Sequence, residues 1–574
     1  MRVPLLIRLF LPATLLAGGL TAQTVQPDTN LSPDELASRF LAQATFGPTT
    51  EAIAELRGLG NDYNGWIDRE VAKPATLAAP LAVAAKTSGQ ITSITNAYNR
   101  RARNQVMISA SDQLRQRVAY ALSQIFVISD NISAISNAEE GSSSYYDMLV
   151  NDSFGTFRQL LMDVTRHPMM GRFLSHYHNR KSDPAAGTRP DENYAREVMQ
   201  LFTIGLYRLN PNGTYQFDVT GRPLEAYTND QITEFARVFT GFTDEDNNPG
   251  AVGTGSGRTD FPRVTAQNYT DPMKMWDPRH DTGAKNLHNY AGARKASLPA
   301  NQSGLQDIND ALDNLVEHPN TDPFICRQLI QRLVTSNPSD GYVARVAGAF
   351  ANNGSGQRGS MVAVIKAILL DPEARNPAFI VDPEHGKLRE PFVRTTHLLR
   401  AFRYSVSGSL LPYDFASAVT ETTLGQYPMS APSVFNFYLP DFEPPGPLGA
   451  AGLVGPEFQI LNSVFAITTP NALYNLLNTK FIISVVNQEV PSAGSFTLDL
   501  SPQAALADNA GALVDNIDLL LTHGTLSSAT RAVVITAVNG VTTAMVPTGS
   551  TLALTKARLA VYLVAVSPDF AILK

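Results

Sequence analysis

The sequence predicts an all-α fold, a large multi-helix globular array with long irregular loops and little strand. Apolar residues recur at helical spacing through much of the chain, and several of these stretches open with helix-capping signals. Hydrophobic residues make up 44% of the 574 residues, which is enough to bury a large core and argues against a disordered chain.

The first 22 residues have the composition of a signal peptide. Arg2 and Arg8 supply positive charge, and the apolar stretch at residues 9–20 is too short to span a bilayer. Cleavage after Ala22 is expected. The sequence therefore predicts an exported protein, periplasmic or extracellular. No later segment is apolar for long enough to predict a membrane span.

Local signals place several helices along the chain. Residues 32–35, Ser-Pro-Asp-Glu, form a capping box that opens a helix, and residues 228–231, Thr-Asn-Asp-Gln, form a second one. Residues 114–125 carry the apolar stripe of another helix, with Arg115 and Arg117 expected on its wetter side.

The loops suggest how the chain is divided. Residues 244–261 are rich in Gly, Asn and Asp, and residues 440–456 are rich in Pro and Gly. The second loop is expected to separate a main helical body, residues 31–440, from a C-terminal helical region, residues 457–574. A little strand is expected at residues 481–486 and 492–502.

Charge and cysteine content exclude some functions. The formal net charge of −7 lacks the basic footprint of a nucleic-acid-binding protein, so no such partner is expected. Cys326 is the only cysteine, which rules out an intramolecular disulfide. Because it lies in an apolar helical stretch, we interpret it as a buried hydrophobic residue rather than a nucleophile.

The most informative stretch is the polar helix predicted at residues 189–202. At 100° per residue, one arc collects five hydrogen-bonding side chains while the apolar residues fall on the other. An amphipathic helix with a surface ion pair explains part of this pattern. The crowding also suits either a polar network between helices or the wall of a site. The arc contains Glu192, Asn193, Arg196, Glu197 and Gln200.

A second polar group surrounds His280 and Asp281, with Lys285 close behind. A histidine beside an acid can serve as a general base or a metal ligand. Phosphohydrolases of the His-Asp type carry the same dipeptide, but on a helix with further ligands. Pro278 and Gly283 predict a loop here, so that comparison is set aside.

Metal binding is an open alternative at two further places. His176 and His178, followed by Asp183, could complete a metal site with His280 or Glu192 if the fold brings them together. Residues 244–248 are rich in oxygen ligands suited to calcium, although they lack the EF-hand pattern and a solvated acidic loop explains them better. No phosphate-binding or dinucleotide-binding motif is present, so no cofactor is assigned.

Taken in order, these motifs resemble a bacterial family catalogued as domain of unknown function 1800. Residues 192–197, Glu-Asn-Tyr-Ala-Arg-Glu, resemble its most distinctive motif, whereas Gln200 stands where the family usually has an acid. The resemblance implies an exported helical protein and no specified activity. It also implies a joint role with an exported sulfatase-like partner, which members often have encoded beside them. The similar stretches are residues 37–41 with 44–48, 192–197 with 201–205, 227–242, 280–283 with 285, 324–334, 371–373, 387–402, and 425–426 with 432–438.

Two functions are compatible with these observations. One is a hydrolase with a His/Asp/Glu site acting on an extracytoplasmic substrate; the other is a non-enzymatic binding or assembly partner of the sulfatase-like protein. The first requires the helix near residue 195 and the loop near residue 280 to meet around an open cleft. Its catalytic residues would be His280, Asp281, Glu192 and Glu197, and its substrate-binding residues Asn193, Arg196 and Lys285.

Overall fold

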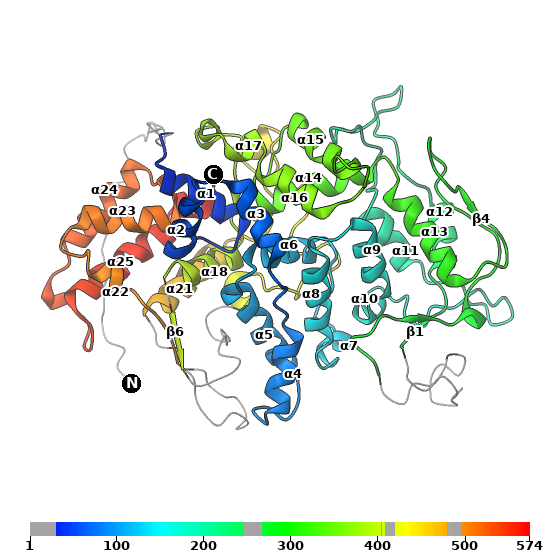
Figure 1. Cartoon of the computed structure of the whole chain (residues 1–574), viewed down its shortest axis with the longest axis horizontal. Helices are drawn as coiled ribbons and strands as arrows, with labels where there is room; N and C mark the ends of the chain where they lie inside the picture. Colours follow the sequence, from blue (N-terminus) through cyan, green and yellow to red (C-terminus); the bar gives the residue numbers. More distant parts are fainter. Residues whose placement is uncertain are drawn as a thin grey trace.

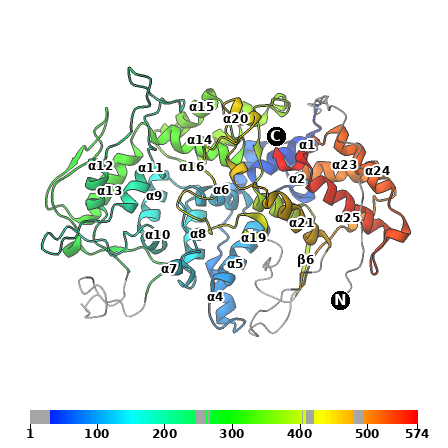
Figure 2. The ribbon, with the colours of Figure 1, turned by 180° about the vertical axis from the view of Figure 1, so that it is seen from behind.

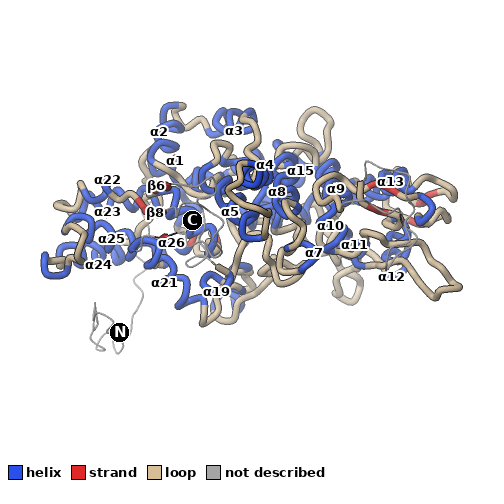
Figure 3. The backbone as a smooth tube through the Cα atoms, turned by 90° about the horizontal axis from the view of Figure 1, so that it is seen from below, coloured by secondary structure: helices blue, strands red, loops and turns tan. Residues whose placement is uncertain are grey.

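The computed structural model describes residues 30–245, 261, 267–402, 404–407, 420–478, 481–482 and 495–574. The predicted signal peptide and most of the predicted loop at 244–261 lie outside these ranges. Helices α1 to α26 and short antiparallel strand groups make up the regular structure (Figures 1 and 3). The prediction of an all-α array with little strand is confirmed. Within the described ranges, every helix is too short or too polar to cross a membrane.

The described residues of the first half of the chain form twelve helices, and the predicted capping boxes open two of them. Ser32 Oγ accepts the backbone N–H of Glu35 at 3.3 Å, and the Glu35 carboxylate accepts the backbone N–H of Ser32 at 2.6 Å. The Thr228 box has the same reciprocal pattern. These helices are α1 (Pro33–Ala44), α2 (Thr50–Gly58), α3 (Tyr63–Ala72), α4 (Ala79–Thr87), α5 (Asn96–Ser109), α6 (Gln113–Ser123), α7 (Ser133–Ser136), α8 (Gly141–Asp152), α9 (Phe157–Arg166), α10 (Pro168–Phe173), α11 (Asn193–Gln200) and α12 (Asn229–Val238).

In the second half, the part of the chain that the structure describes adds fourteen helices. Cys326 is fully buried, and burial raises the pKa of its thiol well above the usual range, so the interpretation as a core residue is confirmed. These helices are α13 (Gly304–Val316), α14 (Thr321–Leu333), α15 (Asp340–Ala351), α16 (Met361–Leu369), α17 (Pro372–Arg375), α18 (Pro391–Ala401), α19 (Glu421–Leu424), α20 (Pro447–Ala450), α21 (Phe465–Asn478), α22 (Ser501–Ala504), α23 (Ala510–Leu521), α24 (Ser528–Asn539), α25 (Leu552–Ala565) and α26 (Pro568–Ala571).

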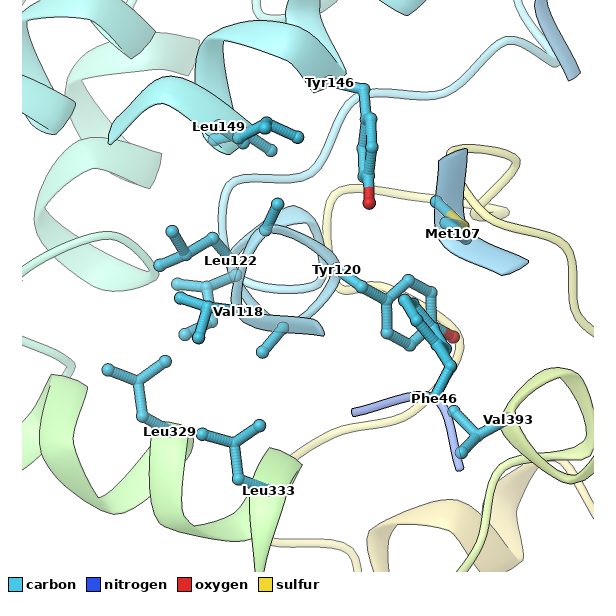
Figure 4. Packing of buried hydrophobic residues seen from close by; sticks show 14 of the residues in the cluster. Phe46, Met107, Val118, Tyr120, Leu122, Tyr146, Leu149, Leu329, Leu333 and Val393 are labelled. Carbon is cyan, nitrogen blue, oxygen red and sulfur yellow. The ribbon is translucent and has the colours of Figure 1, made fainter. Parts of the chain in front are cut away.

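Helix α6 lies at the centre of the molecule and is buried along its whole length (Figure 4). Val118 and Leu122 project on one side of it, while Tyr120 lies among residues from other segments. The expectation that Arg115 and Arg117 stay on a wet side is wrong, because they are only 9% and 2% exposed. Their guanidinium groups are accommodated by backbone carbonyls: Arg115 donates to Val71 and Arg117 to Arg332.

The strands in the described ranges are short, and their pairs are antiparallel. The predicted strand near residues 481–502 is confirmed by β7 and β8. The pairs are β1 (Phe242–Thr243) with β2 (Lys274–Met275), β3 (Lys285–Asn286) with β4 (Ser297–Leu298), and β5 (Lys387–Leu388) with β9 (Ile572–Leu573), while β8 (Ser495–Leu498) lies between β6 (Tyr404–Ser407) and β7 (Phe481–Ile482).

The C-terminal end of the chain returns to its beginning, and the C-terminus lies beside α1 in Figures 1 and 2. Arg39 of α1 donates through Nε to the backbone carbonyl of Lys574 at 3.0 Å. The same hydrophobic cluster includes Ala37 near the start and Phe570 near the end. Residues of the predicted main body and of the predicted C-terminal region therefore share one core.

Candidate functional site

The two stretches singled out in the sequence are both held by α12. Thr233 donates its hydroxyl to Glu192 Oε1 at 3.1 Å, and Arg237, one turn later, forms a bidentate pair with Asp281 at 3.0 Å for both contacts. Within the described residues, no hydrogen bond joins Glu192 or Glu197 to His280. The fold thus brings both stretches to one helix without bringing their side chains to one cleft.

His280 is enclosed in a charged network that the sequence did not reveal. Its Nδ1 lies 2.9 Å from the backbone carbonyl of Thr240, and its Nε2 lies 3.0 Å from Oδ2 of Asp307 on α13. Lys285 donates to the same Asp307 oxygen at 2.6 Å and to the carbonyl of Gly283 at 3.0 Å. The side chain of His280 has no exposed surface, so this geometry ties the loop to α13 and leaves no face for a substrate.

The Asp307 carboxylate is held in its charged form by this network. Burial alone would raise its pKa, but the hydrogen bonds from His280 and Lys285 outweigh burial and lower the pKa below its usual range. Gln302 donates to the other carboxylate oxygen at 2.8 Å. Both oxygens are therefore occupied, as expected of a structural ion-pair network.

Asp281 is fixed in a similar way. Burial alone would raise its pKa, whereas its hydrogen bonds with Arg237 and with the backbone N–H of Gly283 lower it. A Cβ atom at position 283 would lie 2.5 Å from Arg237 Nη2, which explains why a glycine follows the His-Asp pair. The Asp281–Arg237 pair anchors the loop to α12.

The polar arc of α11 is divided between the surface and the interior. Glu192, Asn193 and Arg196 lie at the surface or are half-buried, and Glu192 pairs with Arg196 at 3.6 Å. Glu197 is only 5% exposed, and its Oε2 has no hydrogen-bond partner among the described residues. Burial raises the pKa of Glu197 to about 7, with Arg196 opposing the shift. Among the predicted site residues of this helix, Glu197 is thus the one that combines burial with a raised pKa.

A cavity of about 750 Å³ opens beside these stretches, and we call it the arginine cavity. None of the seven predicted site residues lines it. Its lining comes from α7, α10, the following turn, the segment before α11 and residues 267–269. The residues are Ser133, Ala134, Asn137, Gly171, Arg172, Ser175, Tyr177, His178, Asn179, Arg180, Thr188, Arg189, Asp191, Gln267 and Tyr269.

The described lining of this cavity carries three arginines and one acid. Arg172 binds both oxygens of the buried Asp244 at 2.9 Å, so its charge is compensated inside the wall. Arg189 is exposed, and no described residue forms a hydrogen bond or ion pair with its guanidinium. The uncompensated charge of the cavity is therefore positive, and Arg189 is available to a ligand.

Aromatic stacking and strained backbone shape the same wall. The ring of His178 is stacked between Tyr177, at 3.9 Å, and Phe261, at 4.4 Å. Ser175 and His178 adopt φ values of 63° and 59°, a left-handed backbone conformation that residues other than glycine rarely adopt. Such strain is concentrated at functional sites, where the surrounding structure maintains it.

Asn179 connects the two sides of the arginine cavity. Its side-chain amide donates to the carbonyl of Asp191 at 3.1 Å and accepts the backbone N–H of Asp191 at 2.8 Å. Its own carbonyl accepts the N–H of Gly241 at 2.7 Å. The cavity is consequently part of the same framework as α11 and α12.

The histidine-based metal hypothesis finds no geometric support among the described residues. His176 is buried, Nε2 lies 2.8 Å from the carbonyl of Thr165, and burial lowers its pKa to about 4, whereas His178 faces the cavity. Asp183 lies in an exposed turn and accepts two backbone N–H groups. Among the described residues, no three His, Cys, Asp or Glu side chains are placed to hold a metal ion. In the segment considered for calcium, Asp244 is bound by Arg172, and residues 246–248 lie outside the described residues.

The sequence did not single out Asp307, Arg172 or Arg189 as members of these sites. Asp307 lies 27 residues after His280, and no local spacing connects the two. Two signals in the sequence touch the cavity: His178, which the sequence indicated as a possible metal ligand, and the stretch at residues 189–202, whose first residues line the cavity.

Comparison with known proteins identifies the family. A family model described as "Protein of unknown function (DUF1800)" matches residues 39–572. The chain belongs to the DUF1800 family. No curated protein and no solved structure matches it.

Proposed function

We propose that this DUF1800 protein is an exported, non-enzymatic binding protein that holds an anionic ligand in the arginine cavity. The observation that carries the proposal is the exposed Arg189 guanidinium, without a described partner, in a cavity whose other cationic side chains are Arg172 and Arg180. The planar guanidinium matches carboxylate, sulfate and phosphate oxygens in pairs.

The remaining wall suits a ligand that is more than a simple ion. The stack of Tyr177, His178 and Phe261 stiffens the wall, while Ser175 and Gln267 add hydrogen-bonding groups to the lining. A volume of about 750 Å³ lies within the range of sites for small molecules. An organic acid or an acidic saccharide meets these requirements.

Arg189→Gln tests the proposal in the full mature chain. Thermal unfolding would be followed at constant ionic strength with increasing sulfate, phosphate, citrate or glucuronate. We expect a saturable rise in Tm with at least one of these anions, because a ligand that binds the native state stabilises it. Arg189→Gln should abolish the rise, and Arg222→Gln, an exposed arginine away from the cavity, should retain it. Equal responses of the two variants, or no saturable response of the wild type, would refute the proposal.

Export itself rests on the N-terminal sequence, with Arg2 and Arg8 before an apolar stretch. The protein recovered from the periplasm or medium of a bacterial host should begin at Gln23, as measured by mass spectrometry of the intact chain. An uncleaved protein that stays in the cytoplasm would contradict this part of the proposal.

An exposed arm favours an assembly role alongside ligand binding. Residues 206–226, which we call the arm, fold back on themselves through isolated antiparallel bridges. Phe217 is 57% exposed and Val219 at the tip is 105% exposed. Exposed apolar side chains on a well-formed arm are suited to a protein partner. We expect this protein to capture the exported sulfatase-like protein in a pulldown. The double variant Phe217→Ser and Val219→Ser should no longer capture it. Capture by the double variant would exclude the arm as the binding surface.

A hydrolase is the second candidate, and one observation favours it. The pKa of Glu197, about 7, suits a general acid near neutral pH. The burial of His280 argues that its imidazole is not the base. The test is turnover of sulfate, phosphate and glycoside esters by the wild type and by Glu197→Gln. A wild-type rate that falls at least about a hundredfold in the variant would support catalysis, and equal rates would reject Glu197 as the acid.

A further inference from the structure

A second cavity, of about 420 Å³, lies under the arm and is separate from the arginine cavity. Residues of the arm form one side, the start of α12 another, and the segment around residue 290 and the turn between α13 and α14 close it. Its volume also lies within the small-molecule range. We call it the ring cavity, because Tyr227, His288, Tyr290 and His318 line it.

The rings are held in place by their own contacts. His318 packs edge-on against Tyr290 and against His288, with ring centroids 4.8 and 5.6 Å apart. The Tyr290 hydroxyl donates to the carbonyl of Asn314 at 2.8 Å, and Gln231 donates to Nδ1 of His288 at 2.8 Å. The aromatic wall is therefore fixed before any ligand arrives, which reduces the entropy lost on binding.

His318 presents a hydrogen-bond donor without a partner. Its Nδ1 accepts the backbone N–H of Asn320 at 3.1 Å, so the hydrogen of the neutral ring is on Nε2. Burial, followed by the nearby Arg208 and Arg358, lowers the pKa of His318 to about 4 and keeps the ring neutral. The side chain is only 7% exposed, and no described residue accepts from Nε2. An N–H group without a partner in a cavity wall favours an acceptor on a ligand.

Charge separates this cavity from the first one. Among its described lining residues, Arg208 and Glu225 are the only charged side chains, and they have opposite signs. The other polar groups are neutral and include the amide of Asn289. These charges favour a neutral ligand, because a ligand of either sign would be repelled by one of the two side chains.

From these observations we propose that the ring cavity binds a neutral saccharide. Sugars combine apolar C–H faces, which pack on aromatic rings, with hydroxyl groups, which accept from a donor such as His318 Nε2–H and donate to a carboxylate such as Glu225. The proposal does not depend on the anionic ligand of the arginine cavity, because the two cavities share no lining residue.

The test uses the full mature chain with glucose, maltose, cellobiose and N-acetylglucosamine as probes. Binding would be measured by saturation-transfer NMR and by calorimetry. His318→Asn removes the Nε2–H donor, while its side-chain oxygen can still accept the N–H two residues ahead. We expect saturable binding of at least one probe, weakened about fivefold or more by His318→Asn and by Glu225→Gln.

Two controls make the result specific. Glu384→Gln removes an exposed carboxylate far from the cavity lining and should bind as the wild type does. Arg189→Gln should also leave sugar binding unchanged; a loss there would place the sugar in the arginine cavity and overturn the proposal. If His318→Asn does not fold, sugar binding by Glu225→Gln and Asn289→Ala, which change exposed lining positions, tests the proposal instead. No saturable binding of any probe by the folded wild type, or unchanged binding by the lining variants, would overturn it as well.

Discussion

At the scale of single residues, Glu197 is the side chain whose environment departs most from that of its neighbours on α11. Glu192, on the same helix, is exposed and paired with Arg196, whereas Glu197 is buried with one oxygen unpartnered. The folded-state pKa of about 7 lies above the ordinary value of 4.5. The protonated carboxyl is thus the form that the fold favours.

This difference predicts a pH-dependent effect of Glu197→Gln on stability. A raised pKa gives a contribution that is fully present below about pH 4.5 and is lost as pH rises through about 7. Glutamine stays neutral, so the variant should gain about 1–2 kcal/mol in free energy of unfolding at pH 8 and show no gain at pH 4. Chemical denaturation at both pH values measures this. Glu192→Gln is the surface control, and a gain of equal size at the two pH values would contradict the assignment.

At the scale of elements, the network around Asp307 joins the His-Asp loop to α13. Asp307→Asn would leave Lys285 buried beside a neutral amide. Removing one partner of a buried ion pair costs about 3–5 kcal/mol, because the other charge stays uncompensated. Urea unfolding should show a loss of this size, with ligand binding in the arginine cavity retained by the folded fraction.

The matched control for this prediction lies on the same helix. Asp313 pairs with Arg158, but its side chain is 44% exposed, so Asp313→Asn should cost at most about 1 kcal/mol. A stable Asp307→Asn protein that has lost an enzymatic activity would reverse the interpretation and return His280 to a catalytic role.

The elements also show what the sequence could predict and what it could not. The starts of α1 and α12 were predictable because the capping contacts of Ser32 and Thr228 are local. The burial of Arg117 was not, because periodicity defines a face and cannot say whether α14 covers it. The pairing of His280 with Asp307 depends on tertiary packing. The arginine cavity depends on how turns around Ser175 and Arg189 meet, for which no spacing rule exists.

At the scale of the whole molecule, the two ends of the chain complete one core. Strand β9 pairs with β5, and α1 packs on α23, so the predicted main body obtains part of its packing from residues after 457. His397 of α18 reaches into the same region, where its Nε2–H donates to the carbonyl of Leu520 at 2.8 Å. A boundary near residues 440–456 can separate these regions in the sequence, but the structure gives them a common interior.

A truncated chain tests whether that common interior is required. The fragment 23–456 lacks α23, which packs on α1 and accepts hydrogen bonds from Ser38 and His397, so it would expose apolar surface that the full chain buries. We expect it to show helical far-UV circular dichroism without a cooperative urea transition, since loss of specific packing leaves secondary structure but no unique core. Adding residues 457–574 as a separate chain should restore cooperativity. A fragment that unfolds alone in one sharp transition, close to that of the full protein, would establish the main body as an independent folding unit.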